Sequence, residues 1–393
     1  MGWVKMPMEV FDPEGANPCR VLRHALPKAA YESGGGLGGG EMLVFRLRKP
    51  AFLVLLAFGV ASVVFLALFK IKVHERYTPL PRVVGAWGRG DHRFGRVLGK
   101  DGHFHGPQSF WVTAAGGVDV LDTYNSRVLA FSPQGRLTGG FSYRRQGFQL
   151  MDDLTAGRRH NLYLANASAG EVEKFTPGGR LLLTFPPSAG SNRPLLEGLA
   201  AGGSGTIYLQ DLLAGSRGYQ GRLAVYDRRG TLLRTLNVVR VRPDGSRRVE
   251  RGSPIPVEVS SFVPGGGGDL YVETVGDGLE RSILVYNSDG RLLRRFQIGE
   301  ADLIWSSSLV GVDGAGRIYV GFNLGTPQGK VEQFSPGGKL LRVLAAPASR
   351  TVRAHVYARV DQAGDVYLLR EDERGLTVRE LVRHTQRRWV PRW

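Results

Sequence analysis

Residues 118–137 read VDVLDTYNSRVLAFSPQGRL, and this stretch holds both patterns that recur through the last three quarters of the chain. It opens with a short apolar segment, Val118–Asp122, of the kind that forms a β-strand. A second such segment ends at Phe131, and Ser-Pro-Gln-Gly then provides a turn before a third strand begins at Leu137. Two turns and three strands are therefore predicted within these residues.

The first pattern occurs six times, and the residues at the centres of the copies are Val120, Tyr163, Tyr208, Tyr271, Tyr319 and Tyr367. The steps between them are 43, 45, 63, 48 and 48 residues, and a step of about 40–50 residues with β-type segments is typical of propeller blades. The second pattern follows five copies and ends at Leu137, Leu181, Leu232, Leu292 and Leu340. A further apolar segment precedes each set, so we predict an all-β, six-bladed β-propeller with four antiparallel strands per blade.

The run DTYNSRVLAFSPQGRL, at 122–137, resembles the NHL repeat of six-bladed propellers. The resemblance extends over residues 83–393, where the other copies keep the strand and turn residues but lack the Asp-Thr-x-Asn-x-Arg run. It implies a central channel and a ring that closes by pairing the two chain ends. Residues 83–87 are one candidate for the outer strand of the sixth blade, and residues 388–390 are the other.

An uncharged stretch precedes the repeats, and it reads AFLVLLAFGVASVVFLALF at 51–69. As a helix it would span about 28 Å, close to the thickness of a bilayer core. A buried helix and a cleaved signal peptide are the alternatives. Because Lys70 and Lys72 follow instead of small residues, the sequence favours an uncleaved anchor. We therefore predict one transmembrane helix at 50–72 and a linker at 73–82 ahead of the propeller.

Basic residues flank both sides of this stretch, but a single N-terminal anchor ahead of a large domain usually places that domain outside. We expect a single-pass protein of a bacterial cytoplasmic membrane with an extracytoplasmic propeller. Residues 1–49 are expected to be a flexible tail. Gly-Gly-Gly-Glu before Met42 is what a translated ribosome-binding site would yield, so an alternative start there would leave 1–41 untranslated. The single cysteine, Cys19, excludes an internal disulfide.

The formal net charge of +17 favours anionic partners. An outside location argues against nucleic acid and favours an anionic cell-surface polymer, lipid headgroups or an acidic protein. The longest step between repeats has extra residues at 237–257. Apolar residues and arginines there flank a Pro-Asp-Gly turn, and this pattern predicts a β-hairpin projecting from the third blade. Its arginines either guard a solvated edge or bind an anionic partner, and they are Arg240, Arg242, Arg247, Arg248 and Arg251.

Catalytic motifs are few. His103 and His105 precede the inner strand of the first blade, and His355 precedes that of the sixth, so the three could converge at the channel mouth and bind a metal. Three separate solvent-facing histidines are the alternative. Asp152 and Asp153 are expected to be surface or turn residues. We therefore expect no cofactor, with Zn²⁺ or Ca²⁺ as the alternative.

The sequence thus favours a membrane-anchored, NHL-type propeller that acts as an extracytoplasmic binding or scaffolding module. The alternative function is a metal-dependent propeller lyase or hydrolase that uses the channel histidines. The two hypotheses differ in whether the channel mouth holds a metal. Neither names the ligand.

Overall fold

The structure is a computed structural model. It describes residues 69–391 apart from short internal gaps at 101–103, 144–148, 187–193, 216–217, 242–246, 256, 276–279, 299–306, 325, 328 and 347–351. The chain divides into a unit of residues 71–390 and a second unit made of 1–70 with 391–393. The fold described below is that of the first unit.

Three consecutive antiparallel sheets follow the order of the chain and form blades 1 to 3. In each, the strand order in the sheet is the order in the sequence, as expected for a propeller blade. Blade 3 has a fifth strand at its outer edge. The strands are β5 (Ser109–Val112), β6 (Val118–Asp122), β7 (Arg127–Phe131) and β8 (Leu137–Ser142); β9 (Met151–Ala156), β10 (Leu162–Asn166), β11 (Glu171–Phe175) and β12 (Leu181–Phe185); β13 (Leu195–Ala201), β14 (Ile207–Gly215), β15 (Gly218–Tyr226), β16 (Leu232–Val241) and β17 (Arg247–Val249).

Blades 4 and 5 repeat this arrangement, and blade 6 combines the two ends of the described chain. The strands of blades 4 and 5 are β18 (Ser261–Pro264), β19 (Leu270–Val275), β20 (Arg281–Tyr286) and β21 (Leu292–Gln297); β22 (Ser307–Val312), β23 (Ile318–Phe322), β24 (Lys330–Phe334) and β25 (Leu340–Ala345). Blade 6 contains β27 (Ala358–Val360), β28 (Val366–Glu371), β29 (Gly375–Pro391), β1 (Phe69–Trp87) and the short β2 (Arg93–Phe94). The prediction of six blades with four antiparallel strands is confirmed.

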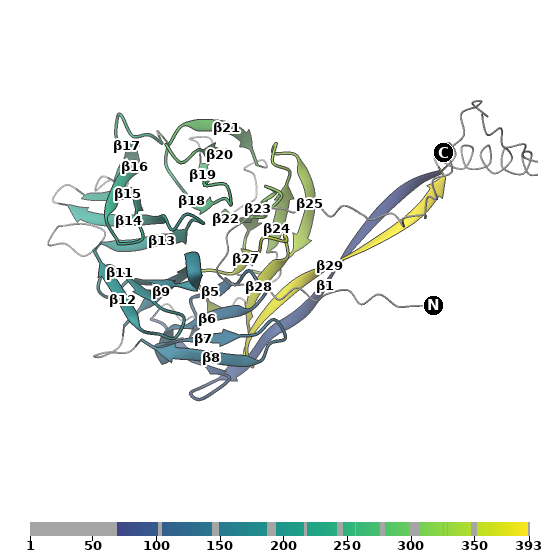
Figure 1. Cartoon of the computed structure of the whole chain (residues 1–393), viewed down its shortest axis with the longest axis horizontal. Coiled ribbons are helices and arrows are strands. Elements are labelled where there is room, and N and C mark those ends of the chain that lie inside the picture. Colours follow the sequence, from purple (N-terminus) through teal and green to yellow (C-terminus); the bar gives the residue numbers. More distant parts are fainter. Residues whose placement is uncertain are drawn as a thin grey trace, which may run out of the picture. The chain divides into compact units, whose positions relative to one another are not determined.

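The inner strands contact one another all the way round the ring, in the order β5, β9, β13, β18, β22, β27 and back to β5. Figure 1 shows the sheets arranged around this centre. Six buried apolar clusters lie within the described residues, and each joins side chains of two neighbouring blades. The core is therefore distributed over the junctions between blades, because each sheet must bury both of its faces against its neighbours.

The second sequence pattern forms the turn between the third and fourth strands of a blade. Gly179 has a φ of 82°, a backbone conformation that favours glycine. A Cβ at this position would lie 2.2 Å from Cβ of Phe141 on the preceding blade, and the same approach occurs between Gly338 and Phe296. The glycine is thus needed both for the turn and for the close packing of consecutive blades.

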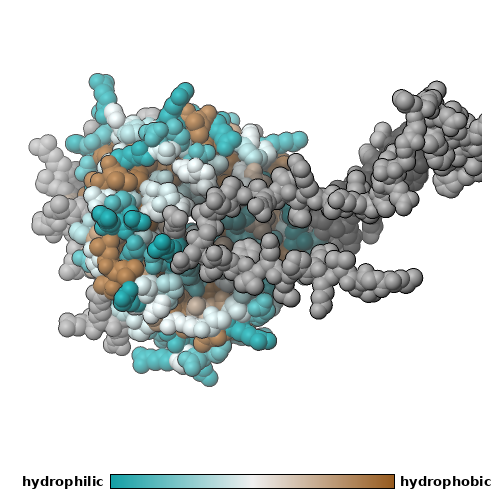
Figure 2. Space-filling model, viewed as in Figure 1, coloured by the Kyte–Doolittle hydropathy of each residue, from teal (hydrophilic) through white to brown (hydrophobic). Residues whose placement is uncertain are grey.

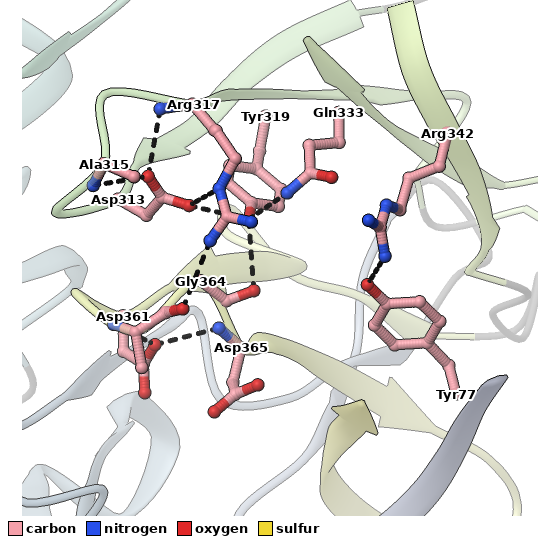
Figure 3. A network of polar contacts seen from close by, with 11 residues as sticks. Tyr77, Asp313, Ala315, Arg317, Tyr319, Gln333, Arg342, Asp361, Gly364 and Asp365 are labelled. Atoms are coloured by element: carbon pink, nitrogen blue, oxygen red, sulfur yellow. Dashed lines mark hydrogen bonds and ion pairs between the residues drawn. The ribbon is translucent and has the colours of Figure 1, made fainter. Parts of the chain in front are cut away.

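The tyrosine of the first pattern ties neighbouring blades together, as Figure 3 shows for blades 5 and 6. The hydroxyl of Tyr319 lies 3.0 Å from Oδ2 of Asp313 and 3.2 Å from the carbonyl oxygen of Gly364 in the next blade. Arg317 donates from Nε to the same carboxylate at 2.6 Å. Burial is the main cause that raises the pKa of Tyr319, so its hydroxyl keeps its proton and can donate.

Strand β1 closes the ring as the outermost full strand of blade 6, which confirms residues 83–87 as the closing strand. Residues 388–390 lie instead in β29, the third strand of that blade. β1 begins at Phe69, so the expected linker at 73–82 and the last residues of the expected helix at 50–72 are strand. The reason is visible in Phe69-Lys70-Ile71-Lys72-Val73, which alternates with the period of a strand.

The rest of the expected membrane span, like the expected tail at 1–49, lies outside the described residues. Within the part of the chain that is described, no helix has both the length and the apolar character needed to cross a bilayer. Short elements complete the fold: a three-stranded sheet of β3 (Val97–Leu98), β4 (Phe104–His105) and β26 (Val352–Arg353), and the 3-10 turns η1 (Thr123–Asn125) and η2 (Arg158–His160).

Exposed leucines recur at the start of the outer strands. In the view of Figure 2, small hydrophobic patches alternate with hydrophilic side chains. The exposed apolar residues of these strands include Leu182, Leu232, Leu233, Leu292, Leu293, Leu340 and Leu341. In each of five blades a register shift interrupts the pairing of the third strand with the fourth, and such bulges help to keep an outer edge from pairing with another chain.

Candidate functional site

A cavity of about 340 Å³ opens at the end of the channel where the inner strands begin. Its wall carries hydroxyl and amide groups from blades 3, 4 and 5, and blade 6 adds His355, Tyr357 and Arg359. The polar residues from the other blades are Asp153, Glu197, Gln210, Ser260, Ser261, Ser307 and Ser308. A concave site with a few convergent polar groups is where a small ligand would bind by default.

A buried ion pair forms the floor of this cavity. Nη2 of Arg359, on β27 of blade 6, lies 3.2 Å from Oδ1 of Asp153, on β9 of blade 2. The same carboxylate accepts the hydroxyl of Ser109 at 2.8 Å and the backbone N–H groups of Leu154 at 2.7 Å and Leu199 at 3.3 Å. Three groups from three other strands, together with the N–H of Leu154 on its own strand, therefore hold Asp153 in place.

Arg359 also spans the gap between blades 6, 1 and 2. Its Nε donates to the carbonyl oxygen of Phe110 at 3.2 Å, and its Nη2 donates to that of Leu154 at 3.3 Å. The guanidinium lies 5.7 Å from the ring centroid of Trp111, within cation–π range. Burial lowers the pKa of Arg359, while the nearby Asp153 opposes that change.

The expectation that Asp152 and Asp153 are surface or turn residues is wrong. Both lie in the inner strand β9, and Asp153 is only 5% exposed. The sequence did not reveal this because the partner of Asp153, Arg359, comes from the other end of the chain and from a blade that is not its neighbour. Burial raises the pKa of Asp152, and the nearby His355 acts in the opposite direction.

A second polar network supports the wall between blades 4 and 5. Oε2 of Glu273, a fully buried residue on β19, accepts the hydroxyl of Ser261 at 2.6 Å, and Oε1 accepts Nη1 of Arg281 at 3.2 Å. Ser307 also donates to Glu273. The serine hydroxyls at the cavity edge are therefore oriented by a buried ion pair.

A second cavity, of about 290 Å³, lies at the opposite end of the channel. Arg359, Ala200 and Val263 line both cavities, so the arginine lies between the two ends. The wall of this second cavity is built from the last residues of the inner strands and from the turns that follow them, including Gly265 and Gly266. Its polar side chains are few.

Of the three predicted metal ligands, two fall among the described residues. His105 lies on β4, which pairs in parallel with β26 so that His105 is opposite Arg353, two residues before His355. His355 is exposed and lines the mouth cavity. His103 lies outside the described residues, so the complete set of three stays a prediction. Among the residues that are described, no group of three or more His, Cys, Asp or Glu is placed to bind a metal.

The predicted hairpin is present in the third blade. β17 pairs antiparallel with β16, with Arg240 opposite Arg248, and it adds a fifth strand to the sheet instead of projecting freely. Arg240 forms an ion pair with Glu250, and Arg247 forms one with Glu258. Arg240 is 71% exposed at its side chain. Arg248 and Arg251 are also exposed, and Arg242 lies outside the described residues.

The sequence indicates a solvated loop at Glu371-Asp372-Glu373, but this is wrong for Glu371, which is buried at the end of β28. In blades 1 and 3 the acid four residues into the second strand pairs across the sheet with an arginine, as Asp122 does with Arg127 and Asp211 with Arg222. The equivalent residue of blade 6 is Arg370, opposite Thr377, and Glu371 follows one residue later. Glu371 lies opposite Leu376. Neither of its oxygens has a hydrogen-bond partner in the described structure. The carboxyl lies against Gly106, which is distant in the sequence, so no local pattern signals its burial.

Comparisons with known proteins find likeness in structure only. No family model matches the chain, and no curated protein is similar to it in sequence. The chain is similar to a virginiamycin B lyase from Staphylococcus aureus solved with quinupristin, with 10% identity and a TM-score of 0.43 over 79% of this chain and 100% of that one.

Two further solved structures show a comparable likeness. A gluconolactonase from Xanthomonas campestris shares 18% identity, with a TM-score of 0.41 over 79% of this chain and 100% of that one. A calcium-binding regucalcin from Agrobacterium tumefaciens shares 12% identity, with a TM-score of 0.45 over 77% and 97% of the two chains. At these identities the likeness concerns the fold alone, and the NHL resemblance stays a prediction.

Proposed function

We propose that the chain is a membrane-anchored propeller that binds a small polar ligand at the channel mouth. The observation that carries the proposal is the 340 Å³ cavity with its ring of serine, glutamine and tyrosine side chains. The uncharged stretch at 51–69 supports the anchor. An extracytoplasmic position of the propeller follows from the usual orientation of a large domain behind a single anchor.

The arrangement of charges at the floor favours binding over catalysis. Asp153 is held by Arg359 and by three neutral donors, and Glu273 is held by Arg281 and two serines. Groups that are tied to one another in this way are poorly placed to transfer protons, because a general base must reach the proton it abstracts. They are well placed to keep the hydroxyls of Ser261 and Ser307 in fixed directions for a ligand.

Filling the mouth with a large side chain tests this site. We expect that Ser308→Trp abolishes the binding of small hydroxylated compounds, measured by saturation-transfer NMR with a panel of monosaccharides, amino sugars and sugar acids. Ser288→Trp, in an exposed turn of blade 4, should leave binding unchanged. If no member of the panel binds the wild type at millimolar concentration, or if both variants bind equally, the mouth is not the ligand site.

A metal-dependent lyase or hydrolase is the second candidate, because the pairing of β4 with β26 brings the backbone of His105 close to the segment that carries His355. This alternative predicts stoichiometric Zn²⁺ or Ca²⁺ in the purified protein, measured by elemental analysis. His105→Ala and His355→Ala should each remove it, while His92→Ala, outside the proposed set, should retain it. A protein purified without any bound metal would contradict the metal enzyme.

The arginines of the hairpin offer a separate contact for an anionic partner. We expect weaker binding to heparin, by about tenfold at low salt, when Arg240, Arg242, Arg247 and Arg248 are changed to Ser. Each contact between an exposed arginine and an anionic group of the polymer adds a modest amount to the free energy of binding, and salt screens it. The matched control changes four exposed arginines of other turns to Ser and so has the same net charge: Arg136, Arg180, Arg229 and Arg291. Equal elution of the two variants from a heparin column would remove the hairpin from the partner surface.

A further inference from the structure

A further cavity, of about 360 Å³, lies at the junction of blades 5 and 6. Its size falls within the range of about 300–1,000 Å³ that is usual for small-ligand sites. The wall is formed by β25 of blade 5 and by β1, β28 and β29 of blade 6. The cavity shares no lining residue with either cavity of the channel, so it is a separate place on the molecule.

Two arginines of blade 6 line this cavity, Arg370 on β28 and Arg379 on β29. Arg370 lies opposite Thr377 in the pairing of the two strands, and Leu368 lies opposite Arg379. The two arginines are therefore diagonal neighbours on one face of the sheet. Nε of Arg370 is buried and has no acceptor in the described structure. Among the described residues, no acid lines the cavity and neither arginine forms an ion pair.

The acids that follow these arginines in the sequence do not face the cavity. Successive side chains of a strand point to opposite faces of the sheet, so Glu371 and Glu380 lie on the other face of blade 6. Glu380 forms an ion pair with Arg82, and the carboxyl of Glu371 lies against Gly106. Because an arginine side chain keeps its positive charge in proteins, the cavity holds two cations without an acid to balance them.

Other blades place ion pairs at the equivalent positions. In blades 1 and 3 the residue that corresponds to Arg370 is Asp122 or Asp211, and each pairs with an arginine of the next strand. In blade 5 the residue that corresponds to Arg379 is Glu332, which forms an ion pair with a lysine of its own strand. Like charges beside one another destabilise a strand pair. The two arginines of blade 6 therefore do not serve the stability of the sheet.

The rest of the wall is apolar, and a third arginine lies behind it. Leu344 and Leu381 are buried in the cluster between blades 5 and 6, and Leu368 packs against that cluster. Arg342 of β25 donates to the hydroxyl of Tyr77, a wall residue on β1, and its guanidinium lies 5.4 Å from the centroid of that ring (Figure 3). The cavity thus combines an apolar surface with a local excess of positive charge.

We propose that this cavity binds an amphiphilic oxyanion, a carboxylate or phosphate ester that carries a short apolar chain. The guanidiniums of Arg370 and Arg379 hold the oxyanion, because the planar fork of arginine matches two oxygens at once. The chain is removed from water along Leu344, Leu368 and Leu381. The ligand differs in class from the hydroxylated compounds proposed for the channel mouth, and the two sites are tested separately.

The test measures the binding of octanoate and octyl phosphate to the purified full chain by equilibrium dialysis. We expect at least one of the two to bind below millimolar concentration, and the tighter of them identifies the head group. Octanol and octyltrimethylammonium, which have the chain without the negative charge, should bind at least tenfold more weakly. Acetate and inorganic phosphate, which have the charge without the chain, should also bind at least tenfold more weakly. Octanol that binds as tightly as both anions would contradict the proposal.

Two double variants locate the site. Arg370→Gln/Arg379→Gln should weaken binding of the tighter anion at least tenfold, whereas Arg229→Gln/Arg374→Gln, which removes two exposed arginines and gives the same net charge, should bind it as the wild type does. Circular dichroism checks that the variants are folded. If the first variant does not fold, Arg370→Lys/Arg379→Lys replaces it and should bind at least threefold more weakly than the wild type, because lysine lacks the fork. Equal affinity of the wild type and the cavity variant, or no binding of either anion, would overturn the proposal.

Discussion

Replacing Asp153 with alanine is expected to destabilise the propeller by about 3–4 kcal/mol, because removing one partner of a buried ion pair leaves the other charge uncompensated. The guanidinium of Arg359 would lose its carboxylate while remaining inside the channel. The donors of Ser109, Leu154 and Leu199 would lose their acceptor as well. Urea unfolding followed by circular dichroism measures the loss as a lower midpoint.

Asp152 provides a matched control on the same strand. It is the same residue type, one position away and only partly buried, and the described structure shows no ion pair for it. Asp152→Ala should therefore change the free energy of unfolding by less than about 1 kcal/mol. Similar losses for the two variants would mean that the Arg359–Asp153 pair does not hold the channel together.

Glu371→Leu is expected to stabilise the protein by on the order of 1–3 kcal/mol at pH 8, the usual cost of a buried polar group without a partner, and by less at pH 4. The carboxyl is 3% exposed, and neither oxygen has a hydrogen-bond partner in the described structure. Burial raises its pKa well above the usual value. A leucine of similar size would fill the site without a polar group to desolvate.

The sign follows from the two protonation equilibria. In the unfolded chain Glu371 ionises above about pH 4.3, whereas in the folded protein it stays protonated to much higher pH. The unfolded state therefore binds fewer protons as pH rises, and the wild type loses stability relative to the variant from about pH 4.3 upward, until the raised pKa is passed. Glu373→Leu, at an exposed position of the same loop, should show no such pH dependence. A difference between Glu371→Leu and wild type that is constant from pH 4 to pH 8 would contradict the prediction.

The sequence was most informative where the cause of the structure is local. The spacing of the repeats predicted six blades, because each blade is a chain of hairpins whose turns need glycine and whose strands need alternating apolar residues. The extra hairpin of blade 3 was predicted for the same reason. Its position as a fifth strand of the sheet was not, because the hairpin's first strand is the end of β16, which already pairs with β15 in the blade.

The choice between two candidate closing strands depended on the whole ring. Residues 83–87 and 388–390 have similar strand character, and local pattern cannot rank them. The structure uses both, in β1 and β29, because a long β29 offers its outer edge to β1 along its length. Apolar and basic residues alternate in Phe69–Val73 as they would in a strand. The uncharged stretch directly before them nevertheless led to the prediction of a helix that extends to residue 72.

By itself, the amino-acid sequence determined the class of fold, the number of blades, the turns and the excess of positive charge, since these depend on residues close together in the chain. Only the tertiary structure decided which charges meet. Arg359 and Asp153 are separated by 206 positions in the sequence and pair across the channel. Glu371 is buried against Gly106, which lies far from it in the sequence. Ion pairing in a closed ring is set by geometry around its axis, and no local pattern encodes that geometry.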